Sequence, residues 1–85
     1  MPRIIEAEAL EGYRLRIVFD DGLSGEVDLN DRLFGPLFEP LRDFDLFVEV
    51  HIDEFGVPCW PNGADVAPDA LRRTLESTIQ SQQQP

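Results

Sequence analysis

Two side chains have the types that nucleophilic catalysis needs. Cys59 is the only cysteine and His51 the only histidine among the 85 residues, so they form the only thiol–imidazole combination. A working nucleophile also needs a group that orients the base. Cys59 stands beside Trp60 in a short apolar stretch, which is typical of a buried and inert thiol. We therefore predict no catalytic residue and no enzymatic activity.

Oxygen ligands for a metal ion are offered by the sequence Asp-Leu-Asn-Asp at 28–31. This stretch lacks the glycine and the bidentate glutamate of a calcium loop. A single cysteine excludes both an internal disulfide and a multi-cysteine zinc site, and no glycine-rich phosphate-binding motif is present. We therefore expect no metal and no other cofactor, and interpret residues 28–31 as a solvated turn that caps a helix.

The composition is strongly acidic. Seventeen acidic and seven basic side chains give a formal net charge of −10, and none of the basic residues is a lysine. Phosphate backbones are bound by clustered Lys and Arg, so we expect no direct contact with nucleic acid. An acidic surface favours solubility and speeds the encounter with a basic partner.

No segment approaches the roughly 20 apolar residues that cross a bilayer. The N-terminal sequence also has no apolar stretch long enough for a signal peptide. We therefore expect a cytoplasmic protein that does not bind membranes.

The elements that must position these residues begin with strands. Residues 3–10 have the composition of a strand, and residues 13–29 alternate between apolar and polar on both sides of Asp-Asp-Gly, which predicts a hairpin. Residues 45–53 alternate again, and residues 57–60 form a short partner strand at an edge. Between these strands, prolines divide residues 30–43 into two short helical turns that cover one sheet face.

Residues 59–73 read Cys-Trp-Pro-Asn-Gly-Ala-Asp-Val-Ala-Pro-Asp-Ala-Leu-Arg-Arg and predict a corner between a strand and a helix. Gly63, in an Asn-Gly pair, belongs to the turn that stops the strand. Pro68 suits the first helical position, and Asp69 suits the first turn because of the helix dipole. Leu71 begins an apolar stripe with a period of four residues.

This order of elements predicts an α+β fold. We expect a small antiparallel sheet of about four to five strands, short helical turns in the middle, and a C-terminal helix packed on one face. Residues 1–80 form a single domain in this interpretation. Residues 81–85 form a polar, disordered tail.

Several of these stretches together resemble the family called domain of unknown function 2442. They are Phe-Asp-Asp-Gly at 19–22, Val-Asp-Leu at 27–29, the run from Leu33 to Asp43, and Trp-Pro-Asn-Gly-Ala-Asp followed by Pro-Asp-Ala-Leu within 60–71. The resemblance covers residues 3–75. It implies a small bacterial α+β domain without established enzymatic activity.

The resemblance also implies a genetic context. Genes of this family often lie beside a gene for another small domain, in an arrangement that looks like a toxin–antitoxin pair. Some members carry an added C-terminal helix-turn-helix domain, and we expect this chain to end before such a domain.

The first functional hypothesis is a non-enzymatic protein-binding module, the antitoxin-like half of such a pair. It would cover a small basic protein encoded by a neighbouring gene. The expected partner contacts lie around the corner and the turn before it: Trp60, Asn62, Asp65, Asp53 and Glu54. For Trp60 the alternative is a ring that packs over the core and finds one partner for its N–H.

The second hypothesis is a homo-oligomer, such as a homodimer, with a structural or small-ligand-binding role. The reason for this hypothesis is a set of phenylalanines that is larger than one small core can bury. They are Phe34, Phe38, Phe44, Phe47 and Phe55. An enzyme that uses carboxylates and His51 is the third and weakest hypothesis.

Overall fold

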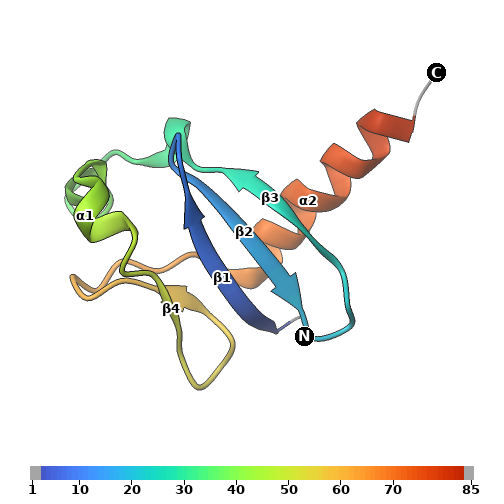
Figure 1. Cartoon of the computed structure of the whole chain (residues 1–85), viewed down its shortest axis with the longest axis horizontal. Coiled ribbons are helices and arrows are strands. Elements are labelled where there is room, and N and C mark those ends of the chain that lie inside the picture. The colour runs from blue at the N-terminus through green and yellow to red at the C-terminus, as the bar shows by residue number, and fades with distance from the viewer. Residues whose placement is uncertain (1–2, 84–85) are drawn as a thin grey trace.

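The computed structural model describes residues 3–83, with side chains up to residue 77 (Figure 1). The elements along the chain are β1 (Ile4–Leu10), β2 (Arg14–Phe19), β3 (Ser24–Asp28), η1 (Asn30–Arg32), η2 (Glu39–Arg42), α1 (Phe44–Phe47), β4 (His51–Ile52), β5 (Pro58–Cys59) and α2 (Pro68–Gln83). The η elements are 3₁₀ turns. The predicted α+β class is confirmed, with the strands divided between one three-stranded and one two-stranded antiparallel sheet.

The larger sheet has the order β1-β2-β3. Its alternating pattern separates two faces, because successive side chains of a strand point to opposite sides. Leu15, Ile17 and Phe19 on β2 are fully buried, whereas Arg14 and Arg16 are exposed. The predicted strand at 3–10 and the predicted hairpin at 13–29 are both confirmed.

Helix α2 covers the inner face of this sheet, crossing behind the strands in Figure 1. Leu71 and Leu75 enter the core from the helix. Gly25 on β3 makes the close approach possible, since a Cβ atom there would overlap Cδ1 of Leu75. The helix begins at Pro68, with Asp69 in its first turn, as the sequence predicts.

The predicted limits of the helix and of the tail need adjustment. Helix α2 continues to Gln83, so residues 81–83 of the expected tail are helical. Residues 84 and 85 lie outside the described residues, as does the side chain of Ile79, which was expected in the apolar stripe.

The expected strand over residues 45–53 is wrong for most of its length. The structure has helix α1 at Phe44–Phe47 and restricts β4 to His51–Ile52. Asp43 is the N-cap of α1, and its side chain accepts a hydrogen bond from the amide of Asp45 at 3.0 Å. The apolar residues 44, 47 and 48 also have helical spacing, and burial of Phe47 decides the conformation.

The first of the two expected turns lies at Asn30–Arg32 (η1), and its N-cap, Leu29, makes no side-chain hydrogen bond to the turn. The second turn, η2, has Pro40 in its first turn. No helix in the described part of the chain is long and apolar enough to cross a membrane.

Candidate protein-binding surface

Trp60 closes the core beside the small sheet. Its side chain is 2% exposed, and its Nε1 donates a hydrogen bond to the main-chain oxygen of Phe47 at 2.8 Å. The two rings stack with centroids 5.9 Å apart. The ring is buried and its single donor is already used, which matches the alternative of a ring packed over the core and leaves Trp60 little surface for a partner.

Asn62 and Gly63 form the turn after Trp60. The Asn62 side chain donates from Nδ2 to the main-chain oxygen of Leu37 at 2.8 Å and accepts from the amide of Ala64 at 3.1 Å. Gly63 has φ of +94°, a left-handed conformation that favours glycine. Both residues are thus used inside the fold: the Asn62 side chain is half-buried with its donor and acceptor engaged, and Gly63 has the backbone conformation of a turn.

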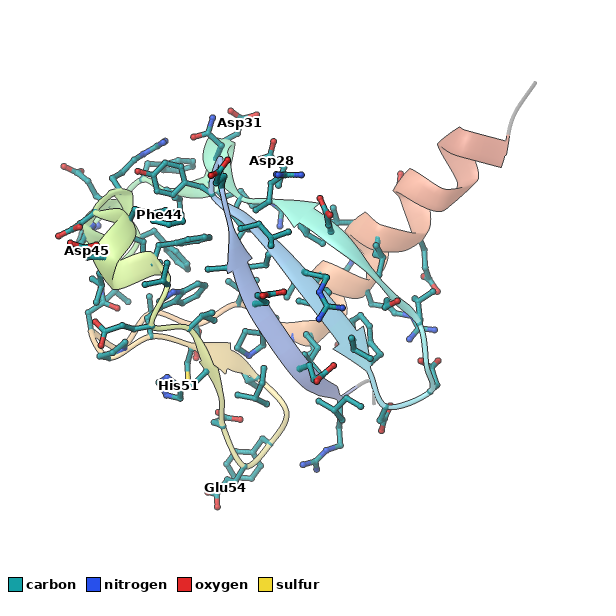
Figure 2. The ribbon with its side chains drawn as sticks, in the orientation of Figure 1. Asp28, Asp31, Phe44, Asp45, His51 and Glu54 are labelled. Carbon is teal, nitrogen blue, oxygen red and sulfur yellow. The ribbon has the colours of Figure 1, made fainter. Side chains whose placement is uncertain are left out.

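The turn between β4 and β5 is built by Asp53. Its Oδ1 accepts hydrogen bonds from the amides of Phe55 at 2.8 Å and Val57 at 3.0 Å. Glu54 lies at the outer end of this turn (Figure 2), and its main-chain oxygen accepts from Arg3 at 2.8 Å. Of the five expected contacts, only the side chains of Glu54 and Asp65 are exposed.

The connection between β3 and β4, residues 29–50, wraps around one end of the molecule. Arg42 fixes its path by donating to the main-chain oxygens of Leu33 at 3.2 Å and Asn30 at 2.7 Å. Its guanidinium also lies 5.7 Å from the ring centroid of Tyr13, whose hydroxyl donates to the main-chain oxygen of Arg42. Together with the bonds from Trp60 and Asn62, these contacts hold the connection in one conformation.

The connection exposes an unusual set of side chains. Among the described residues, four of the six large hydrophobic side chains that remain exposed belong to it: Phe34 at 69%, Leu37 at 51%, Val48 at 46% and Phe44 at 37%. Exposed carboxylates lie among them or directly after them in sequence; they are Glu39, Asp43, Asp45 and Glu49. Figure 2 shows Asp45 on the outer side of α1, whereas the ring of Phe44 lies beside those of Tyr13 and Phe47, with centroids 5.9 Å from each. We call residues 34–49 the acidic–apolar surface.

Sequence reasoning did not single out this exposed surface. The surplus of phenylalanines was the one signal that pointed to it. Phe47 is buried and Phe38 is half-buried, whereas Phe34, Phe44 and Phe55 are exposed. The core therefore buries only some of these phenylalanine side chains.

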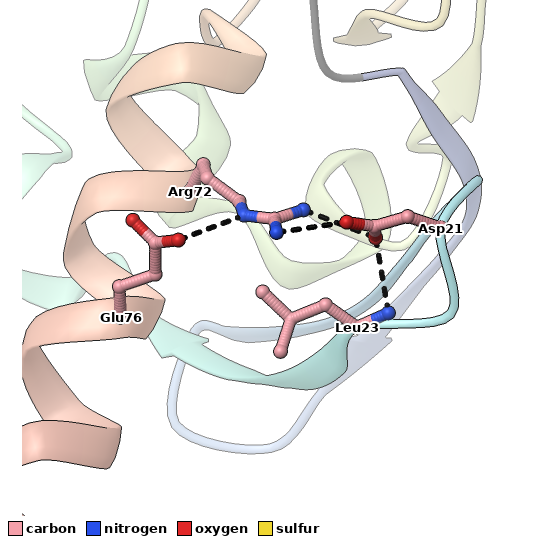
Figure 3. Close-up of polar contacts among 4 residues, drawn as sticks. All are labelled: Asp21, Leu23, Arg72 and Glu76. Atoms are coloured by element: carbon pink, nitrogen blue, oxygen red, sulfur yellow. Dashed lines mark hydrogen bonds and ion pairs between the residues drawn. The ribbon is translucent and has the colours of Figure 1, made fainter.

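A second polar cluster attaches α2 to the β2–β3 turn (Figure 3). Arg72 donates to both carboxylate oxygens of Asp21, at 3.1 and 2.8 Å, and to Glu76 at 3.2 Å. Its guanidinium also lies 5.0 Å from the ring centroid of Phe19. The Arg72 guanidinium, followed by the amide of Leu23, holds the pKa of the Asp21 carboxyl below its usual value. This cluster is structural, since all its charges are paired.

The structure brings Cys59 and His51 together. They are paired residues of β5 and β4, and the Sγ of Cys59 lies 3.2 Å from Nε2 of His51. Burial, followed by the carboxylates of Asp53 and Asp65, raises the pKa of the Cys59 thiol. The other imidazole nitrogen, Nδ1, meets only the main-chain oxygen of Glu49 at 3.3 Å. A protonated thiol without a carboxylate-oriented base is poorly suited to nucleophilic attack.

Metal ligands are not gathered anywhere in residues 3–77. No group of three or more His, Cys, Asp or Glu side chains there is arranged to hold an ion. Asp28 instead accepts a hydrogen bond from the amide of Asn30 at 2.8 Å. Within the same residues, every buried side-chain nitrogen or oxygen has a hydrogen-bond partner.

One solved structure is similar in fold and sequence. It is the crystal structure of "Putative DNA Binding Protein NE0471 from Nitrosomonas europaea ATCC 19718", with a TM-score of 0.80 and 30% identity. The match covers 94% of this chain and 52% of that one, so this chain spans about half the length of that protein. No protein of curated function matches the chain.

A family model matches residues 4–77, from the start of β1 into α2. The matched region contains the corner and the whole connection from β3 to β4. The chain therefore belongs to the family described as Protein of unknown function (DUF2442).

Proposed function

We propose that this protein is a non-enzymatic protein-binding module and that the acidic–apolar surface, residues 34–49, is where its partner binds. The partner is a small basic protein encoded by a neighbouring gene, and this chain is the antitoxin-like half of the pair. The free thiol of Cys59 suits the reducing cytoplasm, where we place this function.

The proposal rests on the exposure of four large apolar side chains on one connection: Phe34, Leu37, Phe44 and Val48. Scattered exposed hydrophobic residues are ordinary, but several on one segment are typical of a surface that a partner covers. Side-chain bonds from Trp60, Asn62 and Arg42 fix the backbone of this connection. A fixed surface loses little conformational entropy on binding, which favours affinity.

Charge supports a basic partner over a second copy of the chain. The acidic–apolar surface carries four carboxylates and one guanidinium, that of Arg42. Two copies that met through this surface would bring like charges together, and each whole chain has a net charge of −10. A basic protein gains from both the apolar contacts and the charge complementarity.

The similar solved structure is described as a DNA-binding protein, but we do not extend DNA binding to this chain. Six of its seven arginines donate hydrogen bonds within the molecule: Arg3, Arg14, Arg16, Arg32, Arg42 and Arg72. Three of these six are in ion pairs with carboxylates. Phosphate binding needs clustered basic groups that are free of such partners.

The test is a calorimetric titration of the purified neighbouring gene product into the full chain. We expect a one-to-one complex, and the double variant F34S/L37S should weaken binding by at least about tenfold, because anchors of this kind dominate interface energy. The control variant I5S/F55S removes two equally exposed apolar side chains elsewhere. It should leave the affinity unchanged.

Three outcomes would contradict the proposal. They are no binding of the neighbouring product, equal weakening by the two double variants, and a homodimer by light scattering that F34S/L37S dissociates. The third outcome would support the second hypothesis, a homo-oligomer that assembles through the acidic–apolar surface.

A further inference from the structure

An open groove lies on the acidic–apolar surface, between two prolines. It has a volume of about 360 Å³ and is lined by Pro36, Glu39 and Pro40. This volume is at the lower end of the range of ligand pockets, about 300–1,000 Å³. The groove is therefore of a size for one long side chain of a partner rather than for a whole helix or strand.

The backbone that forms this groove is held in place. The ring of each proline fixes its own φ angle. Gly35 has φ of +89°, and its main-chain oxygen accepts a hydrogen bond from the amide of Glu39 at 2.9 Å. Asn62 donates to the main-chain oxygen of Leu37 at 2.8 Å. The groove is thus formed before a partner arrives, and its walls lose little conformational entropy on binding.

Glu39 gives the groove its charge, since the other two lining residues are prolines. Its side chain is exposed and forms no ion pair or hydrogen bond with the side chains of residues 3–77. Four carboxylates elsewhere are instead paired with arginines: Glu8, Asp21, Glu26 and Glu76. The Glu39 carboxylate is therefore available to a cation from outside the chain.

A side chain with an apolar stem and a cationic end matches this lining. Its methylene groups pack against the proline rings, while its charged end stays at the carboxylate and in water. A purely apolar side chain would cover the carboxylate without giving it a partner, which costs free energy. Of the two long cations, arginine fits better, because its guanidinium is weakly hydrated and donates two parallel hydrogen bonds to a carboxylate.

We infer that this groove binds one arginine side chain of the basic partner, with the stem between Pro36 and Pro40 and the guanidinium on the carboxylate of Glu39. The inference rests on the function proposed for residues 34–49 and adds the chemistry that the partner must present there. Phe34 and Leu37 precede Glu39 by five and two positions and are exposed. The partner therefore carries apolar side chains beside this arginine.

The experiment titrates N-acetyl-arginine N-methylamide, a capped arginine, into the full chain at constant ionic strength and follows amide NMR shifts. We expect saturable shifts centred on Gly35, Leu37 and Glu39. Capped citrulline, a neutral analogue of the same shape, should not bind. The variant E39Q should weaken binding of the capped arginine about fivefold, the effect of an exposed ion pair. The control variant D31N removes an exposed carboxylate from the same connection, outside the groove, and should have little effect.

Equal shifts with capped citrulline, equal weakening by E39Q and D31N, or shifts spread evenly over the chain would each overturn the inference. So would a neighbouring gene product whose affinity falls with F34S/L37S but not with E39Q, and the proposed function would then stand without the arginine groove. Conversely, capped arginine that binds through Glu39 when the neighbouring product does not bind at all would support the groove and contradict the proposed pairing with that product.

Discussion

The indole of Trp60 and the main chain of Phe47 are joined by a buried hydrogen bond of 2.8 Å, and their rings stack beside it. One residue thus contributes to the core in two ways. Its ring fills volume, and its N–H satisfies a carbonyl at the end of α1. The bond links the corner after β5 to the connection that carries the exposed apolar side chains.

The variant W60F separates these two contributions. It keeps an aromatic ring but removes the indole donor, so the Phe47 carbonyl retains only the long hydrogen bond from the amide of Val50 at 3.4 Å. We expect a loss of about 1–3 kcal/mol in the free energy of unfolding, the usual cost of an unsatisfied buried polar group. Urea unfolding followed by circular dichroism measures it, since the variant lacks the only tryptophan. F55A, at an exposed position, should change stability by less than about 0.5 kcal/mol, and an equal loss there would contradict the assignment.

The variant N62D tests how the corner holds the connection. It keeps the acceptor for the amide of Ala64 but removes the donor to Leu37. We expect a loss of about 0.5–1.5 kcal/mol in stability. Hydrogen exchange should become faster at the amide of Glu39, which donates to Gly35 within the same segment. D65N alters an exposed carboxylate nearby and should leave this exchange rate unchanged; similar acceleration by both variants would argue against the specific role of Asn62.

The pair Asp21–Arg72 predicts a defined dependence of stability on pH. The pKa of Asp21 is lower in the folded protein than in the unfolded chain. Its contribution is therefore complete above the unfolded pKa of about 3.9 and is lost as the pH falls through the folded pKa. We expect D21N to be less stable than the parent at pH 7 and pH 5, with a difference that shrinks towards pH 2.5.

The control for this prediction is D20N, the adjacent carboxylate, which should show no such pH-dependent difference. High salt should also reduce the effect of D21N at pH 7, because the ion pair is partly exposed. A difference between D21N and the parent that stays constant from pH 7 to pH 2.5 would show that the carboxylate charge is unimportant.

Cys59 should react slowly with thiol reagents at neutral pH. Burial and the nearby carboxylates raise its pKa, so little thiolate is present. The pH profile of its alkylation should lie at higher pH than that of free cysteine, and D65N should move it back. H51Q should change the rate little. A neutral-pH rate above that of free cysteine and dependent on His51 would contradict this assignment and favour thiol chemistry.

Local patterns explain why the hairpin and the C-terminal helix could be predicted. The alternation around Asp20–Gly22 and the position of Pro68 are properties of neighbouring residues, and tertiary contacts agree with them. Residues 44–52 carry two patterns at once, with apolar residues at both strand and helix spacing. Packing of Phe47 against Tyr13 and Trp60 decides between them, and it involves residues distant in sequence.

The candidate site was harder to predict for the same reason. Trp60 and Asn62 have the types expected of contact residues, and only their partners 13 and 25 positions away show that they are used internally. The exposed side chains of Phe34 and Leu37 look like core residues in the sequence. Their exposure follows from a small core already filled by other residues.

The groups that accept hydrogen bonds from the side chains of Trp60, Asn62 and Arg42 are all backbone oxygens in the connection, apart from one bond to an Asn30 side chain. Every amino acid supplies such an oxygen. Mutation can therefore replace the outward side chains of residues 34–49 while the chain keeps its course. Descendants of one ancestral gene would be free to diverge in what they recognise without having to evolve a new scaffold.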